Sequence, residues 1–334
     1  DLPLKFAQKL YNEFAIRHPN AFYLRTRQRG MQNWDGKIHY ITKTGQFKIG
    51  LLPKVYDMCI EMGIKPKVVD MRQPLPKVSK VVTNIGKYKL RPEQEKAVKA
   101  VINNKIGNTP FHIGVLDYTV NAGKTLIMSS LYLSYKKQLK TLLITNDSDW
   151  LNQAREEFKQ YLPGEDITFV QGKVLNWSNF TIGMVQSISR NMRFYQKELS
   201  QIDMVLVDEA DQGGSKQYQN VITRLFNTRI RIGLSGTIYM SKLAKDKVKN
   251  MNLECFFGKV IAEFKLKDSI KKGYSTKTIV KMVPGKPWYG NWESDCISYK
   301  EIYDDSITEN NTAWTMAYNR LRWNINQGRY SDLV

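Results

Sequence analysis

Hydrophobic and polar positions follow a regular pattern over the middle of the chain, where short apolar runs alternate with amphipathic stretches. The apolar runs predict strands at Ile113–Leu116, Thr141–Thr145, Ile167–Val170, Thr181–Val185, Met204–Val207 and Arg229–Leu234. The stretches between them have helical spacing and predict, among others, helices over Lys124–Leu139, Trp150–Tyr161 and Ser215–Phe226. Short apolar strands that alternate with helices are typical of an α/β fold, in which helices cover both faces of a mostly parallel sheet.

The pattern is different at the front of the chain. Alternation predicts short antiparallel strands at Phe22–Leu24 and Lys37–Ile41, and helical spacing predicts a helix over Val55–Met62. Prolines then mark a linker that ends near Gly86. A small α+β N-terminal domain is therefore predicted ahead of the α/β domain.

The chain as a whole is predicted to have three parts. The N-terminal domain spans residues 1–80, the α/β domain spans residues 81–275, and the last part spans residues 276–334. In this last part a strand is predicted at Thr278–Val283 and a helix over Ser298–Gln327.

The charge balance points to a class of partner. The chain has 51 Lys and Arg residues against 31 Asp and Glu, which gives a formal net charge of +20. The excess is largest at the front, where residues 1–80 hold 15 basic and 6 acidic side chains. A field of this sign attracts a polyanion such as DNA or RNA. No apolar run approaches the roughly 18 residues of a membrane span, so no membrane partner is expected. The three cysteines lie far apart, which argues against a zinc ribbon or disulfides and for a cytoplasmic protein.

Phosphate binding is predicted where the strand Ile113–Leu116 gives way to a helix. The residues predicted to surround a nucleotide's phosphates are Thr119, Asn121, Ala122, Gly123, Lys124 and Thr125. Small residues let main-chain N–H groups reach the phosphates, Lys124 would pair with the β- and γ-phosphates, and the Thr125 hydroxyl would hold Mg²⁺. The complete pattern has glycine where this chain has Tyr118. An ordinary helix start capped by Asn121 is the alternative.

A second candidate site follows the predicted strand Met204–Val207, which runs into the sequence D-E-A-D at residues 208–211. Three carboxylates within four residues repel one another, which is costly unless a cation or a catalytic role compensates. Asp208 is predicted to bind Mg²⁺ through water, and Glu209 to orient and deprotonate the water that attacks the γ-phosphate. An acidic helix start favoured by the helix dipole is the alternative, but the phosphate loop upstream favours the catalytic interpretation.

Together these motifs resemble those of superfamily 2 helicases, in the same order along the chain. L-R-P-E-Q at residues 90–94 is similar to the family's adenine-reading segment, in which Arg91 and Gln94 would bind the nucleotide. L-S-G-T at residues 234–237 resembles the motif that couples hydrolysis to strand movement, through Ser235 and Thr237. The resemblance implies a RecA-like P-loop NTPase domain that uses ATP and Mg²⁺, with the catalytic residues Lys124, Asp208 and Glu209.

Polar segments after two further predicted strands resemble the family's nucleic-acid contacts. T-N-D-S and W-L-N-Q at residues 145–153 match the first of these, and G-M-V-Q-S at residues 183–187 matches the second. The residues assigned to this contact are Asn146, Gln153, Gln186 and Ser187. Groups of this kind hold phosphates without reading base sequence, so RNA stays open as the polymer.

The N-terminal part is similar to the first domain of the phage UvsW-type recombination helicases, which carries an N-W-D-G-K-I stretch like the one at residues 33–38. The similarity extends through F-F-G-K at residues 256–259 and G-Y-S at residues 273–275. It implies an ATP-dependent DNA helicase that remodels forked and branched DNA, including Holliday junctions. Recombination or replication proteins are candidate partners.

Basic and aromatic residues of the N-terminal part are assigned to DNA contact. Arg25, Arg27 and Arg29 alternate, so on a strand they would project from one face and bind phosphates. Lys37 is assigned to the same contact, and Trp34 would stack on an exposed base. A core position for Trp34, followed by a turn at Asp35-Gly36, is the alternative.

The same resemblance implies that residues 276–334 are a connector and the start of a truncated second RecA-like domain, without its arginine finger. Such a finger is worth about 10³–10⁵ in rate, so the first domain alone should bind ATP but hydrolyse it poorly. Two other functions stay open. A restriction-type double-stranded DNA translocase would move without separating strands, and a basic DNA-binding module with a vestigial nucleotide pocket would not turn over ATP.

Overall fold

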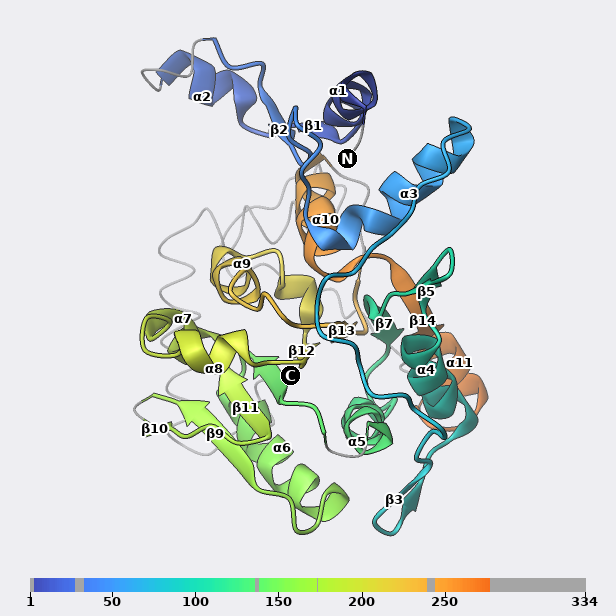
Figure 1. Cartoon of the computed structure of the whole chain (residues 1–334). Coiled ribbons are helices and arrows are strands. Elements are labelled where there is room, and N and C mark those ends of the chain that lie inside the picture. Colours follow the sequence, from blue (N-terminus) through green and yellow to red (C-terminus); the bar gives the residue numbers. More distant parts are fainter. Residues whose placement is uncertain (1–2, 28–32, 136–137, 173, 239–243, 277–334) are drawn as a thin grey trace, which may run out of the picture. The chain divides into compact units, whose positions relative to one another are not determined.

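The computed structural model describes residues 3–27, 33–135, 138–172, 174–238 and 244–276 (Figure 1). The chain divides into two compact units, residues 1–276 and residues 277–334, and every element described below belongs to the first. The strand predicted at Thr278–Val283 and the helix predicted over Ser298–Gln327 lie outside the described residues.

Within the described residues, the largest sheet has eight strands in the order β10-β9-β11-β8-β12-β13-β7-β14. Neighbouring strands are parallel except for β10 and β9, which are antiparallel. Every strand predicted for the middle of the chain is confirmed, and with them the α/β class and the RecA-like parallel sheet. The strands are β7 (Ile113–Tyr118), β8 (Thr141–Thr145), β9 (Ile167–Gln171), β10 (Val174–Leu175), β11 (Phe180–Met184), β12 (Met204–Asp208), β13 (Ile230–Ser235) and β14 (Val260–Phe264).

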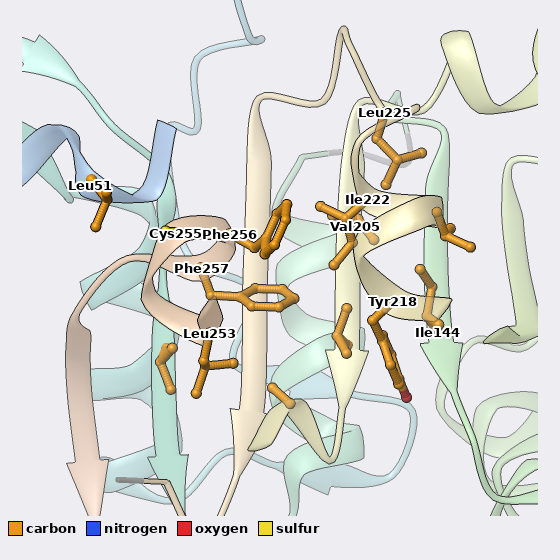
Figure 2. Close-up of a cluster of buried hydrophobic side chains, with 14 of the residues drawn as sticks. Leu51, Ile144, Val205, Tyr218, Ile222, Leu225, Leu253, Cys255, Phe256 and Phe257 are labelled. Atoms are coloured by element: carbon orange, nitrogen blue, oxygen red, sulfur yellow. The ribbon is translucent and has the colours of Figure 1, made fainter. Parts of the chain in front are cut away.

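Alternate residues of the central strands enter two apolar layers, one on each face of the sheet. On β12, Val205 and Val207 belong to one cluster of buried side chains, and Met204 and Leu206 belong to the other. Figure 2 shows the first of these clusters around Val205. Because both faces are covered, the strands are continuous apolar runs in the sequence.

Helices supply the outer half of each layer. The cluster that contains Leu206 includes side chains of α4 (Pro92–Ile102), α5 (Lys124–Ser134) and α6 (Ser148–Tyr161). The opposite cluster includes side chains of α7 (Val185–Arg190), α8 (Gln196–Ser200), α9 (Lys216–Ile222) and α10 (Ala244–Phe257). The helices predicted between the strands are confirmed as α5, α6 and α9, of which α5 and α9 end earlier than predicted. None of the helices within the described ranges is long and apolar enough to cross a membrane.

The N-terminal segment combines short helices with a small sheet. In chain order it contains α1 (Leu4–Glu13), β1 (Ala15–Arg17), α2 (Ala21–Arg27), β2 (Lys37–His39), the 3-10 helix η1 (Ile49–Leu51) and α3 (Leu52–Glu61). β1 and β2 pair antiparallel. The α+β character and the helix at α3 are as predicted. Two small hairpins flank α4, formed by β3 (Asn84–Ile85) with β4 (Tyr88–Lys89) and β5 (Lys105–Ile106) with β6 (Thr109–Pro110).

The strand predicted at Phe22–Leu24 is wrong, because these residues lie in helix α2. Three alternating residues are too few to separate a strand from a helix, so the surrounding packing decides. Ala21 is the buried residue of α2, and a Cβ built on Gly36 would lie 3.1 Å from its Cβ. Phe22 and Tyr23 remain 79% and 54% exposed, because α2 packs through its small residue.

Helix α10 joins the N-terminal segment to the sheet. Leu51 of η1 and Cys255 of α10 are buried in the same apolar cluster, and the Lys54 ammonium lies 2.6 Å from Glu254 Oε2. Gly50 permits this approach, since a Cβ there would collide with the Glu254 carbonyl and lie 2.7 Å from the Cys255 carbonyl carbon. The N-terminal segment therefore shares a core with the α/β layers.

Replacing Gly50 by alanine is expected to lower the free energy of unfolding by at least about 2 kcal/mol, because helix backbone cannot move aside as a flexible side chain can. Denaturant unfolding followed by tryptophan fluorescence measures the change. Gly214→Ala is the control, since a Cβ there meets its nearest atom at an ordinary 3.4 Å. Similar losses in the two variants would contradict the tight contact at Gly50.

Candidate nucleotide and nucleic-acid site

The parallel sheet brings the carboxyl ends of its strands to one edge, and the predicted site residues follow those ends. Lys124 follows β7 after a short loop, Ser235 ends β13 and Asp208 ends β12, and these strands are neighbours in the order given. Asn146 follows β8 and Gln186 follows β11, which continue the row beyond β12. The residues assigned to the nucleotide and those assigned to nucleic acid therefore meet between β12 and β8.

The loop after β7 has the backbone that a phosphate cradle needs. Asn121 and Gly123 have positive φ angles of 63° and 74°, and the Ala122 N–H donates to the Thr119 carbonyl at 3.2 Å. Helix α5 begins at Lys124, directly after this turn. The first N–H groups of a helix have no partner within the helix, so the loop and the helix start together offer donors to an anion.

Tyr118, which replaces the usual glycine of the phosphate-loop pattern, is the last residue of β7. Its side chain is fully buried, and its hydroxyl donates to the Glu93 carbonyl at 2.7 Å. The departure from the pattern therefore changes the support beneath the loop and leaves the turn at Asn121 and Gly123 in place.

Helix α4 braces the loop from the side. Gln94 Nε2 donates to the Ala122 carbonyl at 2.8 Å, and Gln94 Oε1 accepts the Arg91 N–H at 2.8 Å. Arg91 Nη2 also donates to the Asn121 carbonyl at 3.2 Å. Gln94 is 1% exposed, so its carboxamide is held within the protein by these two bonds. The two residues assigned to adenine thus hold the phosphate loop in the described structure.

Lys124 faces the acidic turn that follows β12. Its ammonium lies 3.8 Å from Asp208 Oδ1 and 3.7 Å from Glu209 Oε1. The Asp208 side chain is 3% exposed and that of Glu209 is 42% exposed. Glu209 has a φ of 50°, a left-handed conformation that is uncommon outside glycine and recurs at functional sites. The turn therefore presents one buried and one accessible carboxylate to the same ammonium.

The environment of Asp208 fits a divalent cation. Burial raises the pKa of its carboxyl group to about 6, although the charge of Lys124 opposes the rise. Among the described residues, Asp208 Oδ1 has no hydrogen-bond donor. A buried carboxylate oxygen without a donor costs free energy that a hard cation would recover. Asp208 and the Thr125 hydroxyl at the start of α5 are the residues that would hold Mg²⁺.

Ser235 connects the acidic turn to the loop after β13. Its hydroxyl donates to Asp211 Oδ1 at 3.2 Å and accepts the Thr237 N–H at 3.2 Å. A Cβ built on Gly236, between these residues, would lie 3.0 Å from the Thr119 Cα. Ser235 therefore contacts the D-E-A-D turn, and Gly236, the residue between the two assigned to coupling, lies against the phosphate loop at Thr119.

Two of the residues assigned to nucleic acid are bonded to each other and to the acidic turn. Asn146 Nδ2 donates to Gln212 Oε1 at 2.5 Å, and Gln186 Nε2 donates to the Asn146 carbonyl at 3.4 Å. Gln212 directly follows Asp211 of the D-E-A-D sequence. A polar connection thus crosses from the β11 and β8 ends to the β12 end of the sheet.

The other two assigned residues of this face have different surroundings. Gln153 is exposed on α6, where its Nε2 donates to Glu157 Oε1 at 2.7 Å. Ser187 is buried, and its hydroxyl accepts the Gly172 N–H at 2.9 Å. Gln153 is therefore accessible to a polymer, whereas the Ser187 hydroxyl is already engaged within the protein.

The arginine stripe predicted for the N-terminal segment is wrong in its geometry. Arg25 and Arg27 are exposed on helix α2, and residues two apart on a helix point to different sides. Arg29 lies outside the described residues. Exposed basic side chains are present at α2, but they do not form one row.

Trp34 precedes a turn at Asp35-Gly36, and Lys37 follows it as the first residue of β2. The Lys37 N–H donates to Asp35 Oδ1 at 2.9 Å, and Gly36 has a φ of 78°. Trp34 is half-buried, and its Nε1 donates to the Lys37 carbonyl at 2.9 Å. The Lys37 side chain is exposed.

Charged residues that the sequence did not single out also support the phosphate loop. Glu93 is buried and lies 2.8 Å from the Lys272 ammonium. Burial opposes its ionisation, but the hydrogen bond from Lys272 holds the pKa of Glu93 below its usual value. Asp117, buried in β7, pairs with Lys265. These partners lie 179 and 148 residues apart in the sequence, so no local pattern identifies them.

Comparison with known proteins agrees with this geometry. Residues 87–240 match the protein family described as "Type III restriction enzyme, res subunit". The "ATP-dependent DNA helicase uvsW" of Enterobacteria phage T4 is 22% identical over 228 residues, which cover 62% of this chain and 43% of that protein. The chain therefore spans less than half the length of this relative.

Two crystal structures of T4 UvsW have a similar fold. One, of the UvsW helicase from bacteriophage T4, has a TM-score of 0.59 at 21% identity and covers 79% of this chain and 94% of the other. The second has a TM-score of 0.61 at 22% identity and covers 79% of this chain and 54% of the other. The RecA-like fold is confirmed, and the chain resembles superfamily 2 helicases, those of the UvsW type in particular.

The raised pKa of Asp208 predicts that stability depends on pH when no metal is bound. A carboxyl group whose pKa is higher in the folded than in the unfolded chain stabilises the fold below its unfolded pKa of about 4. That contribution is lost as the pH rises through about 6. Asp208→Asn stays uncharged, so it should raise the free energy of unfolding by about 1–3 kcal/mol near pH 7.5 and by little near pH 4.

Denaturant unfolding at the two pH values, with a chelator present, measures this difference. The exposed Asp166→Asn serves as the control and should change stability little at either pH. If wild type and Asp208→Asn varied in parallel between the two pH values, Asp208 would not be the titrating group.

Proposed function

We propose that the chain carries the ATP-binding motor domain of an ATP-dependent DNA helicase that remodels branched DNA, including forks and Holliday junctions. In this proposal residues 1–80 bind DNA and residues 81–275 bind and hydrolyse ATP. Residues 276–334 are a connector and the start of a second RecA-like domain. The name of the phage T4 relative, an ATP-dependent DNA helicase, supports the reaction and the polymer.

The observation that carries the proposal is the position of Lys124. Its ammonium stands at the start of α5, directly after the phosphate loop, and within 4 Å of both Asp208 and Glu209. A phosphoryl group above this loop would therefore meet a cation, a candidate metal ligand and a candidate base on adjacent strand ends. If Lys124 only formed a structural ion pair with Asp208 and Glu209, neither the left-handed residues before α5 nor the left-handed backbone of Glu209 would be needed.

Each residue has a defined task in ATP hydrolysis under this proposal. Lys124 binds the β- and γ-phosphates, and the loop N–H groups hold their oxygens. Asp208 and Thr125 hold Mg²⁺, which when bound supplies positive charge against the charge that develops on the phosphates. Glu209, the accessible carboxylate, orients the attacking water and accepts its proton.

DNA contact is assigned to two surfaces. Asn146, Gln153 and Gln186 contact the phosphate backbone at the β8 and β11 ends of the sheet, and the exposed Arg25 and Arg27 contact DNA from the N-terminal segment. The net charge of +20 supports a polyanionic partner. Backbone contact alone suits a motor, because it must move along any sequence.

A restriction-type double-stranded DNA translocase is the second candidate, because residues 87–240 match a family named for a restriction enzyme subunit. The two motors would share the nucleotide site and differ in whether movement separates strands. Displacement of a labelled strand from a forked substrate supports the helicase. ATP consumption with movement but no displacement supports the translocase.

ATP turnover by the protein, with and without a four-way DNA junction, tests the motor. We expect strong stimulation by the junction, and a fall in kcat of at least about 100-fold in Lys124→Ala and in Glu209→Gln, because each removes a group needed in the transition state. Lys124→Ala should also weaken ATP binding, whereas Glu209→Gln should retain it.

Lys159→Ala is the matched control, because Lys159 is an exposed lysine whose pairing with Glu156 lies on the surface of α6. Its turnover should equal that of wild type. Turnover that is absent, or indifferent to the junction and to both site variants, would leave a basic DNA-binding scaffold with a vestigial nucleotide pocket.

The double replacement Arg25→Ala/Arg27→Ala tests the N-terminal DNA contact. It should weaken binding to a four-way junction and reduce the slope of log Kd against log salt by about 1–2, because each phosphate contact releases about one counterion. Fluorescence anisotropy titrations at several salt concentrations provide the slope. Lys197→Ala/Arg224→Ala removes the same charge from exposed positions of the α/β domain, and an equal loss there would show that only net charge matters.

A further inference from the structure

Gln212 is the last residue of the short 3-10 helix η2 (Ala210–Gln212), which follows β12 and contains part of the D-E-A-D sequence. Its N–H donates to the Glu209 carbonyl at 3.0 Å, so its main chain is bonded to the candidate base. Its side chain is exposed and reaches the residue after β8, where Gln212 Oε1 accepts a hydrogen bond from Asn146 Nδ2 at 2.5 Å. Gln212 therefore connects a residue assigned to nucleic acid with the residue assigned to deprotonate water.

The turn that carries Glu209 is held from two sides. Glu209 has a φ of 50°, a conformation that costs free energy outside glycine and persists only where the surrounding structure holds it. On one side the Ser235 hydroxyl donates to Asp211 Oδ1 at 3.2 Å. On the other side Asn146 donates to Gln212. Loss of either hydrogen bond would give the Glu209 backbone more freedom to move.

In this position of the turn, Glu209 faces a competing partner. Its carboxylate lies 3.7 Å from the Lys124 ammonium, and Lys124 is the group assigned to the β- and γ-phosphates. A base must instead face its water within hydrogen-bond reach to take the proton. A turn that holds Glu209 on Lys124 therefore restrains hydrolysis, and a movement of the turn would relieve that restraint.

The hydrogen bond between Asn146 and Gln212 is one that a polymer phosphate can replace. A carboxamide oxygen is a neutral acceptor, whereas a phosphate oxygen is charged and accepts stronger hydrogen bonds. Asn146 is half-buried and Gln212 is exposed, so both side chains can be reached from the surface. A backbone phosphate that binds Asn146 Nδ2 would therefore compete with Gln212 for the donor.

We propose that Gln212 is a positioning residue that restrains Glu209 until a nucleic-acid phosphate binds Asn146. The hydrogen bond from Asn146 holds the acidic turn through Gln212, and the phosphate releases the turn by taking over the Asn146 amide. This inference rests on the proposed function, because it takes Glu209 as the base of ATP hydrolysis and Asn146 as a contact of the polymer. The contact within the protein lowers ATP turnover, and the polymer removes that contact.

Steady-state ATP turnover without DNA, and over a range of concentrations of a four-way junction, tests the proposal. Gln212→Ala removes the acceptor and should raise kcat without DNA by about twofold to tenfold, the factor that one neutral hydrogen bond is worth. At saturating junction its kcat should equal that of wild type, so the stimulation ratio falls. The KM for ATP should not change, because Gln212 is not assigned to the nucleotide.

Gln212→Glu should have the opposite effect. A carboxylate holds the Asn146 amide more strongly than a carboxamide does, and it repels a phosphate. The kcat without DNA should fall below that of wild type, and the junction concentration for half-maximal stimulation should rise by about twofold to tenfold. Gln217→Ala and Gln217→Glu are the matched controls, because Gln217 is exposed on α9, and both should behave as wild type.

Asn146→Ala removes the donor of the same hydrogen bond. It should raise kcat without DNA as Gln212→Ala does, although it also weakens the contact with DNA. The double variant should show no further rise, because both changes remove one and the same interaction. A general loss of structure would lower turnover in each variant, and thermal melting establishes that each is folded at the temperature of the assay.

The outcomes are distinct. An unchanged or lower kcat without DNA in folded Gln212→Ala would overturn the restraint while leaving the nucleotide site intact. Additive rises in the double variant would also overturn it, because the two residues would then act separately. Failure of the proposed function looks different: wild type would not turn over ATP, or Lys124→Ala would turn it over as fast as wild type does.

Discussion

The candidate site depends on the attraction between the Lys124 ammonium and the carboxylates of Asp208 and Glu209 at the carboxyl edge of the sheet. Lys124 and Asp208 are both largely buried, at 15% and 3% side-chain exposure, and a buried charge is tolerated only when a partner offsets its desolvation. The parallel sheet creates this meeting, because β7 and β12 flank β13 and all end at the same edge. The loop before α5 and the turn after β12, which carry these charges, contain the left-handed residues Asn121, Gly123 and Glu209.

Much of this could be predicted from the sequence, because the features concerned are local. A strand buried on both faces is a nearly continuous apolar run, so the sequence predicts β7, β8, β9, β11, β12 and β13. The phosphate loop and the D-E-A-D turn are contiguous, and their chemistry follows from adjacent residues. Once the strands were known to be parallel, their order was the only missing step before Lys124 and Asp208 could be placed together.

The rest could not be predicted, because it depends on contacts between distant parts of the chain. The alternation of Phe22–Leu24 predicts a strand, whereas the packing of Ala21 against Gly36 favours helix α2. The partners of Glu93 and Asp117 come from the far end of the unit, at Lys272 and Lys265. Tyr118 stands where the complete phosphate-loop pattern has glycine, and its hydroxyl donates to the Glu93 carbonyl and so anchors the end of β7 beneath the loop.

The hydrogen bonds that link the ends of β12, β8 and β11 have a physical consequence for the proposed motor. Asp211 is bonded to Ser235, and the next residue, Gln212, is bonded to Asn146, which is bonded in turn to Gln186. A displacement of the acidic turn would therefore move or break the hydrogen bonds that link it to the β8 and β11 ends, because a hydrogen bond holds only over a narrow range of distances. A motor must convert a change at the nucleotide into movement along a polymer. In the proposed motor, the hydrogen bonds that run from Ser235 through the D-E-A-D turn and Gln212 to Asn146 would connect the nucleotide site to the β8 end of the sheet.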